Sequence, residues 1–135
     1  MMSPTAATVR LTLHVLAATI WVGGQFTLAG LLPVLRTTDG VAKQAGRAFS
    51  RFAWPAYAIL VVTGMWNLIE VDVAGAPPDY QVTVFVKVTL AILAGAATAL
   101  HTVARSKLAL ALGGSIGALA SVAALFLGVL LRTGR

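Results

Sequence analysis

Cysteine is absent from all 135 residues of the chain. The protein therefore has no disulfide bond, no metal site built on thiolates and no covalently attached c-type haem. A metal ion or a cofactor has to be held by other side chains. Histidine is the obvious nitrogen donor, and the chain has only two, His14 and His101.

Charged residues are also scarce, at 10% of the chain, and only four residues are acidic. Hydrophobic residues make up 59% of the sequence, more than a soluble domain of this length can bury, so we expect lipid as the solvent. The formal net charge of +6 does not indicate nucleic-acid binding, because the basic residues flank apolar runs and form no separate patch. The expected partner is the lipid bilayer.

Long apolar runs with few charged residues divide the sequence into four segments. A helix needs about 20 residues to cross a bilayer. We therefore predict an all-α, polytopic membrane protein with a four-helix bundle as its single transmembrane domain, residues 1–135. The expected helices cover about 4–35, 42–70, 81–104 and 107–132.

Basic residues are divided unevenly between the two sides that these helices define. The loops joining the first helix to the second, and the third to the fourth, carry most of them: Arg36, Lys43, Arg47, Arg51, Arg105 and Lys107. The opposite side carries fewer basic residues and most of the acids: Arg10, Arg132, Arg135, Glu70, Asp72 and Asp79. The positive-inside rule then predicts that the basic loops are cytoplasmic and that both termini lie outside.

The last apolar run has no ionisable residue, and small residues recur in it at four-residue spacing. These residues are Gly113, Gly117 and Ser121. Such spacing lets two helices approach closely. The sequence leaves two alternatives open, which are packing within one chain and a homo-oligomer through this face.

Three functional side chains are expected in one layer near the outer surface. Counting 1.5 Å per residue from the ends of the runs places His14 about 6 Å, Met65 about 7–8 Å and Lys87 about 9 Å below that surface. Arg10 and Trp21 share a helical stripe with His14, and lipid cannot satisfy such groups, so the stripe should face protein. Trp66 and Asn67 accompany Met65 in this layer.

His101 lies near the inner end of the third helix, four residues before Arg105. Its depth should differ from that of His14 by about 20 Å in a hydrocarbon core of about 30 Å. One haem iron cannot take both histidines as ligands at that separation. A single haem with two histidine ligands is therefore not expected.

Three stretches of the sequence carry a resemblance to a known group of membrane proteins. "LHVLAATIWVGG" followed by "LLPVLR" resembles the first helix of the CopD-type and HemJ-type proteins. "SRFAWPAYAILVVTGMWNLIE" resembles their second helix and "VFVKVTLAILAGAATALH" their third. The resemblance implies a bacterial inner-membrane protein of several helices and covers about residues 10–104.

The two branches imply different activities. CopD-type proteins are associated with copper passage across the membrane, whereas HemJ-type proteins bind haem b and oxidise protoporphyrinogen IX. In the second branch a first-helix histidine and a third-helix lysine matter most, and these correspond to His14 and Lys87. The resemblance thus makes Lys87 a candidate catalytic residue. This sequence departs from the HemJ pattern in the spacing that follows each of these two positions.

Haem b binding, with a redox or porphyrin-related role, is the function that we favour. A haem needs a neutral imidazole, an apolar slot between helices and cations for its propionates. His14 supplies the imidazole, Met65 a possible sixth ligand, and Arg10 and Lys87 the cations. The full set of candidate cofactor-binding residues is His14, Met65, Arg10, Trp21, Trp66, Asn67 and Lys87.

Two alternatives remain open. The first is a copper transporter, in which the metal would pass from the outside to a second, inner site along successive ligands, His14, Met65 and His101. Copper(I) prefers soft sulfur ligands, and this chain offers few of them. An assembly subunit without chemistry would use the small-residue face of the last helix. That third function leaves His14 and Lys87 unexplained.

Overall fold

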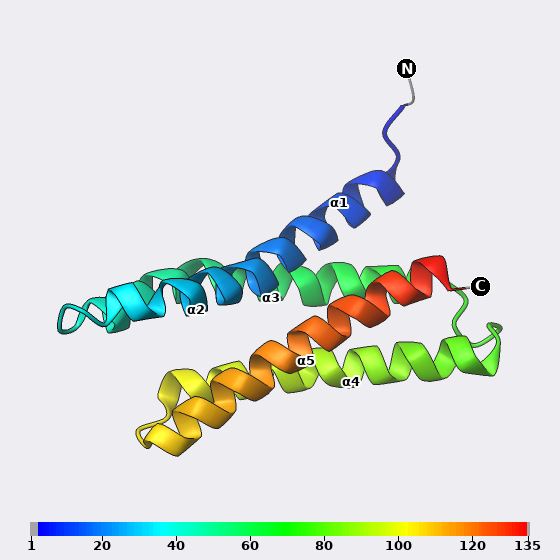
Figure 1. The fold of residues 1–135 in the computed structure, drawn as a ribbon. Coiled ribbons are helices and arrows are strands. Elements are labelled where there is room, and N and C mark those ends of the chain that lie inside the picture. The colour runs from blue at the N-terminus through cyan, green and yellow to red at the C-terminus, as the bar shows by residue number, and fades with distance from the viewer. Residues whose placement is uncertain (1–2, 135) are drawn as a thin grey trace. The chain divides into compact units, whose positions relative to one another are not determined.

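The structure is a computed structural model that describes residues 3–134, so Arg135, counted above with the outer side, lies outside it. The described part contains helices and no strand (Figure 1). Helix α1 (Ala6–Ala18), a π-helical turn η1 (Thr19–Gly23) and helix α2 (Gly24–Leu35) follow one another without a break. They are followed by α3 (Val41–Glu70), α4 (Pro78–Val103) and α5 (Lys107–Thr133).

Within residues 3–134, four helical segments are long and apolar enough to cross a membrane: Ala6–Leu35, Val41–Glu70, Pro78–Val103 and Lys107–Thr133. Large apolar side chains stand exposed along them, among them Phe85 at 73% and Leu119 at 71% exposure. A protein dissolved in water rarely exposes so much apolar surface, because that surface is costly to hydrate. These findings confirm the expectation of an all-helical protein suited to a membrane.

The helix ends agree with the predicted boundaries to within three residues. The first helix begins at Ala6, because Thr5 caps it through a pair of reciprocal hydrogen bonds. The Thr5 hydroxyl accepts from the Thr8 backbone N–H, and the Thr8 hydroxyl accepts from the Thr5 backbone N–H. The third segment begins earlier than expected, at Pro78. Proline suits the first helical position, and Asp79 stands favourably near the positive end of the helix.

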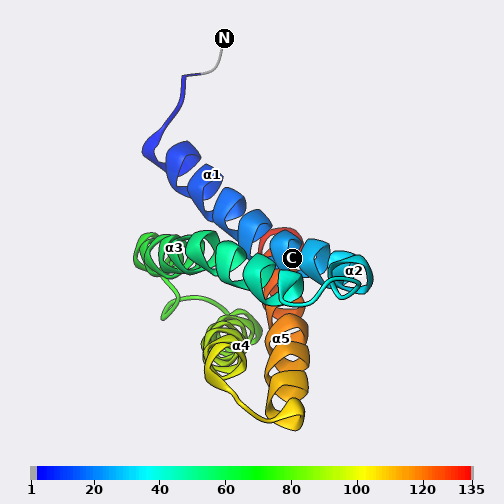
Figure 2. The same ribbon diagram turned by 90° about the vertical axis from the view of Figure 1, so that its left-hand side faces the viewer.

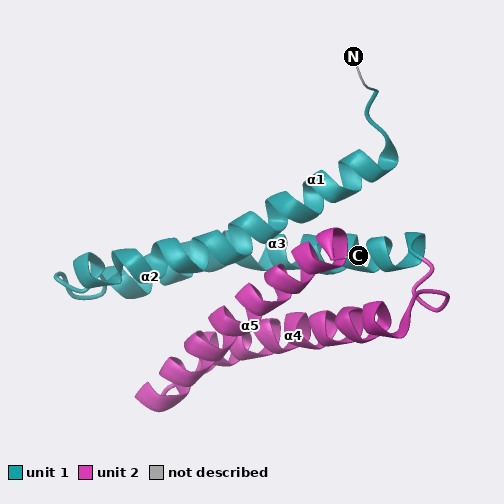
Figure 3. Cartoon of the chain, turned by 45° about the vertical axis from the view of Figure 1, so that its right-hand side comes forward, with its two compact units in different colours: residues 1–71 teal, residues 72–135 magenta. Residues whose placement is uncertain are grey.

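The chain divides into two compact units, residues 1–71 and residues 72–135 (Figure 3). In the first unit the continuous α1–η1–α2 segment packs antiparallel against α3. In the second unit α4 and α5 lie side by side and are joined by residues 104–106 (Figure 2). Each unit is thus a helical hairpin with its own internal contacts.

Small residues bring α4 and α5 close together in the second unit. A Cβ atom on Gly113 would lie 2.9 Å from the Ala97 carbonyl oxygen, and one on Gly117 would lie 2.8 Å from the Thr98 hydroxyl oxygen. Ser121 continues this buried face and donates a hydrogen bond to the Gly117 carbonyl. The small-residue face identified in the sequence therefore packs against α4 of the same chain.

Candidate functional site

The polar stripe of the first helix faces α3 in the first unit. Arg10 contacts Asn67 and His14 contacts Thr63, so the contacts step four residues along each helix in opposite directions. Trp21 follows further along the same side of the segment. The expectation that this stripe faces protein is confirmed within the unit.

Arg10 is held at one end of this series, with only 9% of its surface exposed. Its Nε donates a hydrogen bond of 2.7 Å to Asn67 Oδ1, and its Nη1 lies 3.6 Å from Glu70 Oε1. The guanidinium carbon lies 5.6 Å from the centre of the Trp66 ring, within range of a cation–π interaction. Trp66 Nε1 in turn donates to Glu70 Oε1 at 3.1 Å, so four side chains form one connected cluster.

His14 lies one helical turn further along and is half-buried. Its Nδ1 lies 2.7 Å from the Thr63 hydroxyl oxygen, and that oxygen also lies 2.6 Å from the Ile59 carbonyl oxygen. The imidazole sits beside Gly64, where an added Cβ would be 3.5 Å from His14 Cε1, an ordinary van der Waals contact. The ring is therefore fixed at its Nδ1 edge and flanked by a residue that has no side chain.

Thr63 was not among the residues that the sequence singled out. It is 3% exposed and lies four residues before Asn67, on the same face of α3. The sequence did contain a signal for it. Thr63 and Asn67 are polar residues four apart in an apolar helix, and this spacing matches that of Arg10 and His14 on the first helix.

Trp21 is packed by other aromatic rings and is 2% exposed. Its ring centre lies 5.7 Å from that of Trp54 and 4.6 Å from that of Tyr57. Trp54 and Tyr57 also contact each other edge to face. This aromatic cluster fills the helix interface next to the π turn, a feature of local helix geometry that is frequent at functional sites.

Met65 is not brought together with His14 in the first unit. It follows Thr63 by two residues, which places it about 200° around α3 from the residue that His14 contacts. Its side chain is 59% exposed. Of the expected layer, the structure brings together Arg10 and His14 with residues of α3 and leaves Met65 on another face.

Lys87 and His101 belong to the second unit. The Lys87 ammonium nitrogen lies 3.1 Å from the place where a Cβ on Gly128 would be. The end of the Lys87 side chain therefore packs against α5 at a position that has no side chain. His101 is exposed, and its Nδ1 lies 2.6 Å from the Leu110 carbonyl oxygen. The His101 ring also lies against Gly114.

No group of three or more His, Cys, Asp and Glu side chains in the described residues is arranged to hold a metal ion. A haem does not need such a group, because the porphyrin supplies four nitrogen ligands and the protein supplies one or two.

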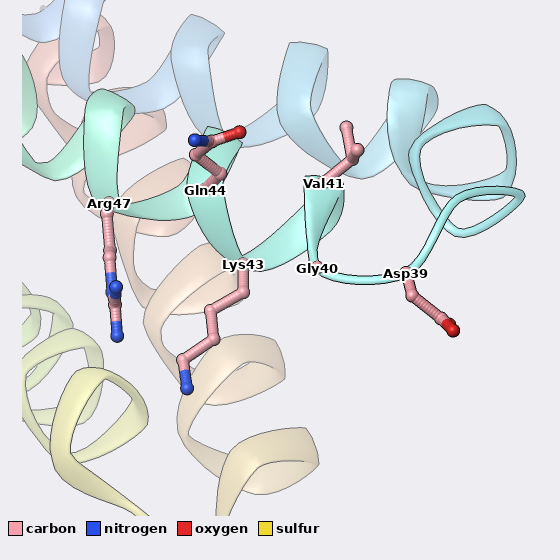
Figure 4. Close-up of a pocket in the computed structure, with 6 residues that line it drawn as sticks. All are labelled: Asp39, Gly40, Val41, Lys43, Gln44 and Arg47. Atoms are coloured by element: carbon pink, nitrogen blue, oxygen red, sulfur yellow. The ribbon is translucent and has the colours of Figure 1, made fainter.

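A second polar region lies at the start of α3. An open pocket of about 380 Å³ is lined there by Asp39, Gly40, Val41, Lys43, Gln44 and Arg47 (Figure 4). Gly40 has a positive φ of 79°, which lets the chain turn into the helix. Thr63 lies about 20 residues further along α3, or about 30 Å, so this pocket is no part of the His14 site.

Comparison of the chain with models of known protein families, with curated proteins and with solved structures finds no match.

Proposed function

We propose that the protein binds haem b in its first unit, with His14 as an axial ligand of the iron. The observation that supports this most is the contact between His14 Nδ1 and the Thr63 hydroxyl, at 2.7 Å. Ligand histidines in metal sites commonly donate their other ring N–H to an acceptor in this way. The proposed role is redox chemistry or chemistry on a porphyrin in a bacterial cytoplasmic membrane.

The surroundings of His14 fit a haem ligand in three respects. The imidazole is half-buried in an apolar segment, Gly64 leaves space beside the ring, and Ala17 and Ala18 follow on the next turn with small side chains. A bound haem would supply one-electron chemistry at its iron. The helices would exclude water and hold the imidazole in place.

Arg10 is the cation placed to bind a haem propionate. It lies four residues from His14, or about 6 Å along the helix. Its guanidinium already contacts Glu70 at 3.6 Å, and the Glu70 side chain is 51% exposed. A propionate carboxylate would take the place of the Glu70 carboxylate on Arg10.

We assign no residue of the first unit as the second axial ligand of the iron, because Met65 lies on a different face of α3 from the one that His14 contacts. Lys87 stays a candidate catalytic residue on the strength of the resemblance to the HemJ-type proteins.

We further propose that both termini lie outside the membrane, because the loops around residues 36–51 and 105–107 carry most of the basic residues.

One spectrum with metal analysis tests the proposed function. We expect the protein purified in detergent from haem-replete cells to show a Soret band that His14→Ala removes. His101→Ala is the matched control, since it removes the other histidine and should leave the band. A colourless protein that binds copper(I) stoichiometrically would favour copper passage, and one with neither ligand would favour an assembly role; each result contradicts haem binding.

A further inference from the structure

We propose that Thr63 is a positioning residue for His14. Its hydroxyl holds the imidazole in the tautomer that carries hydrogen on Nδ1, and this makes Nε2 the nitrogen that coordinates a metal. The role of Nε2 as a haem ligand rests on the proposed function. The tautomer itself is a property of the protein without haem and can be measured there.

The hydrogen on the Thr63 hydroxyl points to a backbone carbonyl. Thr63 Oγ1 lies 2.6 Å from the Ile59 carbonyl oxygen, and a carbonyl oxygen can only accept a hydrogen bond. Two oxygen atoms at that distance with no hydrogen between them would repel each other. The hydroxyl therefore donates to the main chain, as buried threonines in helices commonly do.

The direction of the next hydrogen bond follows. Thr63 Oγ1 has already used its one hydrogen, so it accepts from His14 Nδ1 at 2.7 Å. A neutral imidazole carries hydrogen on only one ring nitrogen, so its lone pair is then on Nε2. A metal binds the neutral ring through that lone pair.

The two bonds also reinforce each other. A hydroxyl that donates to a carbonyl is a stronger acceptor, and a stronger acceptor at Nδ1 makes the opposite nitrogen of the ring a better electron-pair donor to a metal. Thr63 is 3% exposed, so solvent water has little access to replace it as the acceptor. Loss of its hydroxyl should therefore change the electronic state of His14 as well as its orientation.

His101 provides an internal comparison. Its Nδ1 also donates, here to the Leu110 carbonyl at 2.6 Å, so the same tautomer is expected. The acceptor is a main-chain atom and does not depend on Thr63. A substitution at Thr63 should thus change the signals of His14 and leave those of His101 as they are.

The test uses ¹⁵N-histidine NMR on the full-length protein without haem, in detergent micelles. Thr63→Val removes the acceptor with little change in shape, and Thr63→Ser keeps the hydroxyl. Thr27→Val is the matched control, since the Thr27 hydroxyl donates to the Gly23 carbonyl in the same unit but contacts no histidine in that way. His101→Gln assigns the two sets of signals.

We expect the Nδ1–H tautomer of His14 in the wild type, Thr63→Ser and Thr27→Val, and its loss in Thr63→Val. Thr63→Ala gives a second variant without the hydroxyl should the valine variant not fold. The Nε2–H tautomer in the wild type, or an unchanged tautomer in a folded variant without the hydroxyl, overturns the proposal.

A haem titration then separates the two hypotheses. Loss of the Thr63 hydroxyl should weaken haem binding by about 10- to 100-fold, the range typical for loss of such a supporting hydrogen bond, and Thr63→Ser should restore it. Unchanged haem affinity in Thr63→Val would overturn the positioning role. A wild-type protein that takes up no haem contradicts the proposed function, whereas the NMR result still decides what Thr63 does to His14.

Discussion

The ring of Phe49 occupies the space in which a side chain on Gly24 would begin. An added Cβ on Gly24 would overlap the Phe49 ring, whereas one on the neighbouring Gly23 would have no atom within 4 Å. The paired glycines at the junction of η1 and α2 therefore have different roles. Gly24 lets α3 approach with an aromatic residue, and Gly23 has no such contact in the structure.

Substitutions at this pair should separate the two roles. We expect Gly24→Ala to destabilise the protein by about 1–3 kcal/mol, because the Phe49 ring has to move out of a packed interface. Gly23→Ala should be neutral or slightly stabilising, since alanine favours a helix over glycine by up to about 1 kcal/mol. Thermal unfolding in detergent measures both, and equal effects would contradict the assignment.

Asn67 should contribute to stability through Arg10. Replacing Asn67 with Leu keeps a similar volume but removes the acceptor of the Arg10 Nε–H, and a buried donor left unpaired costs about 1–3 kcal/mol. Asn67→Asp retains Oδ1 and should keep most of the stability. Thermal midpoints of the two variants give the comparison, and a leucine variant as stable as the wild type would show that Arg10 finds another partner.

Two neighbouring glycines of α5 should respond differently to alanine. A Cβ on Gly113 would meet backbone atoms of Ala97 and His101 at 2.9–3.1 Å. These backbone atoms can move away only if the two helices separate. On Gly114 it would meet the His101 ring at 3.2 Å, and that side chain can shift. We expect Gly113→Ala to lower the unfolding midpoint clearly more than Gly114→Ala, and the reverse order would count against the α4–α5 packing.

Glu70→Gln tests whether a haem propionate reaches Arg10. Since the half-exposed Glu70 carboxylate competes for the guanidinium, its removal should tighten haem binding by about 1.4- to 5-fold, in line with about 0.2–1 kcal/mol for an exposed ion pair. Asp72→Asn removes the next negative charge along the chain and is the control. Weaker or unchanged haem binding in Glu70→Gln would place the propionates elsewhere.

The absence of native cysteine allows a direct test of membrane orientation. A single cysteine at Thr38, in the loop before α3, should be protected from a membrane-impermeant maleimide in intact cells and should react after the membrane is opened. A cysteine at Ala74, in the loop before α4, should react in intact cells. The opposite pattern would reverse the orientation that the basic residues predict.

Charge and hydropathy alone predicted the helices to within a few residues, because the cost of placing charges in lipid sets where apolar segments end. The same cost correctly predicted that Arg10, His14 and Trp21 face protein. It could not identify Thr63 as the neighbour of His14 or Tyr57 as that of Trp21, since periodicity gives a face and not the register between two helices. The depth estimate for Met65 gave distance along the helix and ignored the angle around it.

The contacts of Arg10 and His14 with α3 also bear on how the first hairpin finds a single alignment. Two apolar helices in lipid can slide along each other with little change in energy, because lipid and neighbouring side chains are equally apolar. A shift by one residue would turn Asn67 and Thr63 away from Arg10 and His14 together. A shift by a full turn would give only one of the two the other's partner and would leave the second opposite an apolar residue. The same polar pairs that make the candidate site therefore exclude the neighbouring alignments, so the proposed haem binding and the correct pairing of the helices depend on the same few atoms.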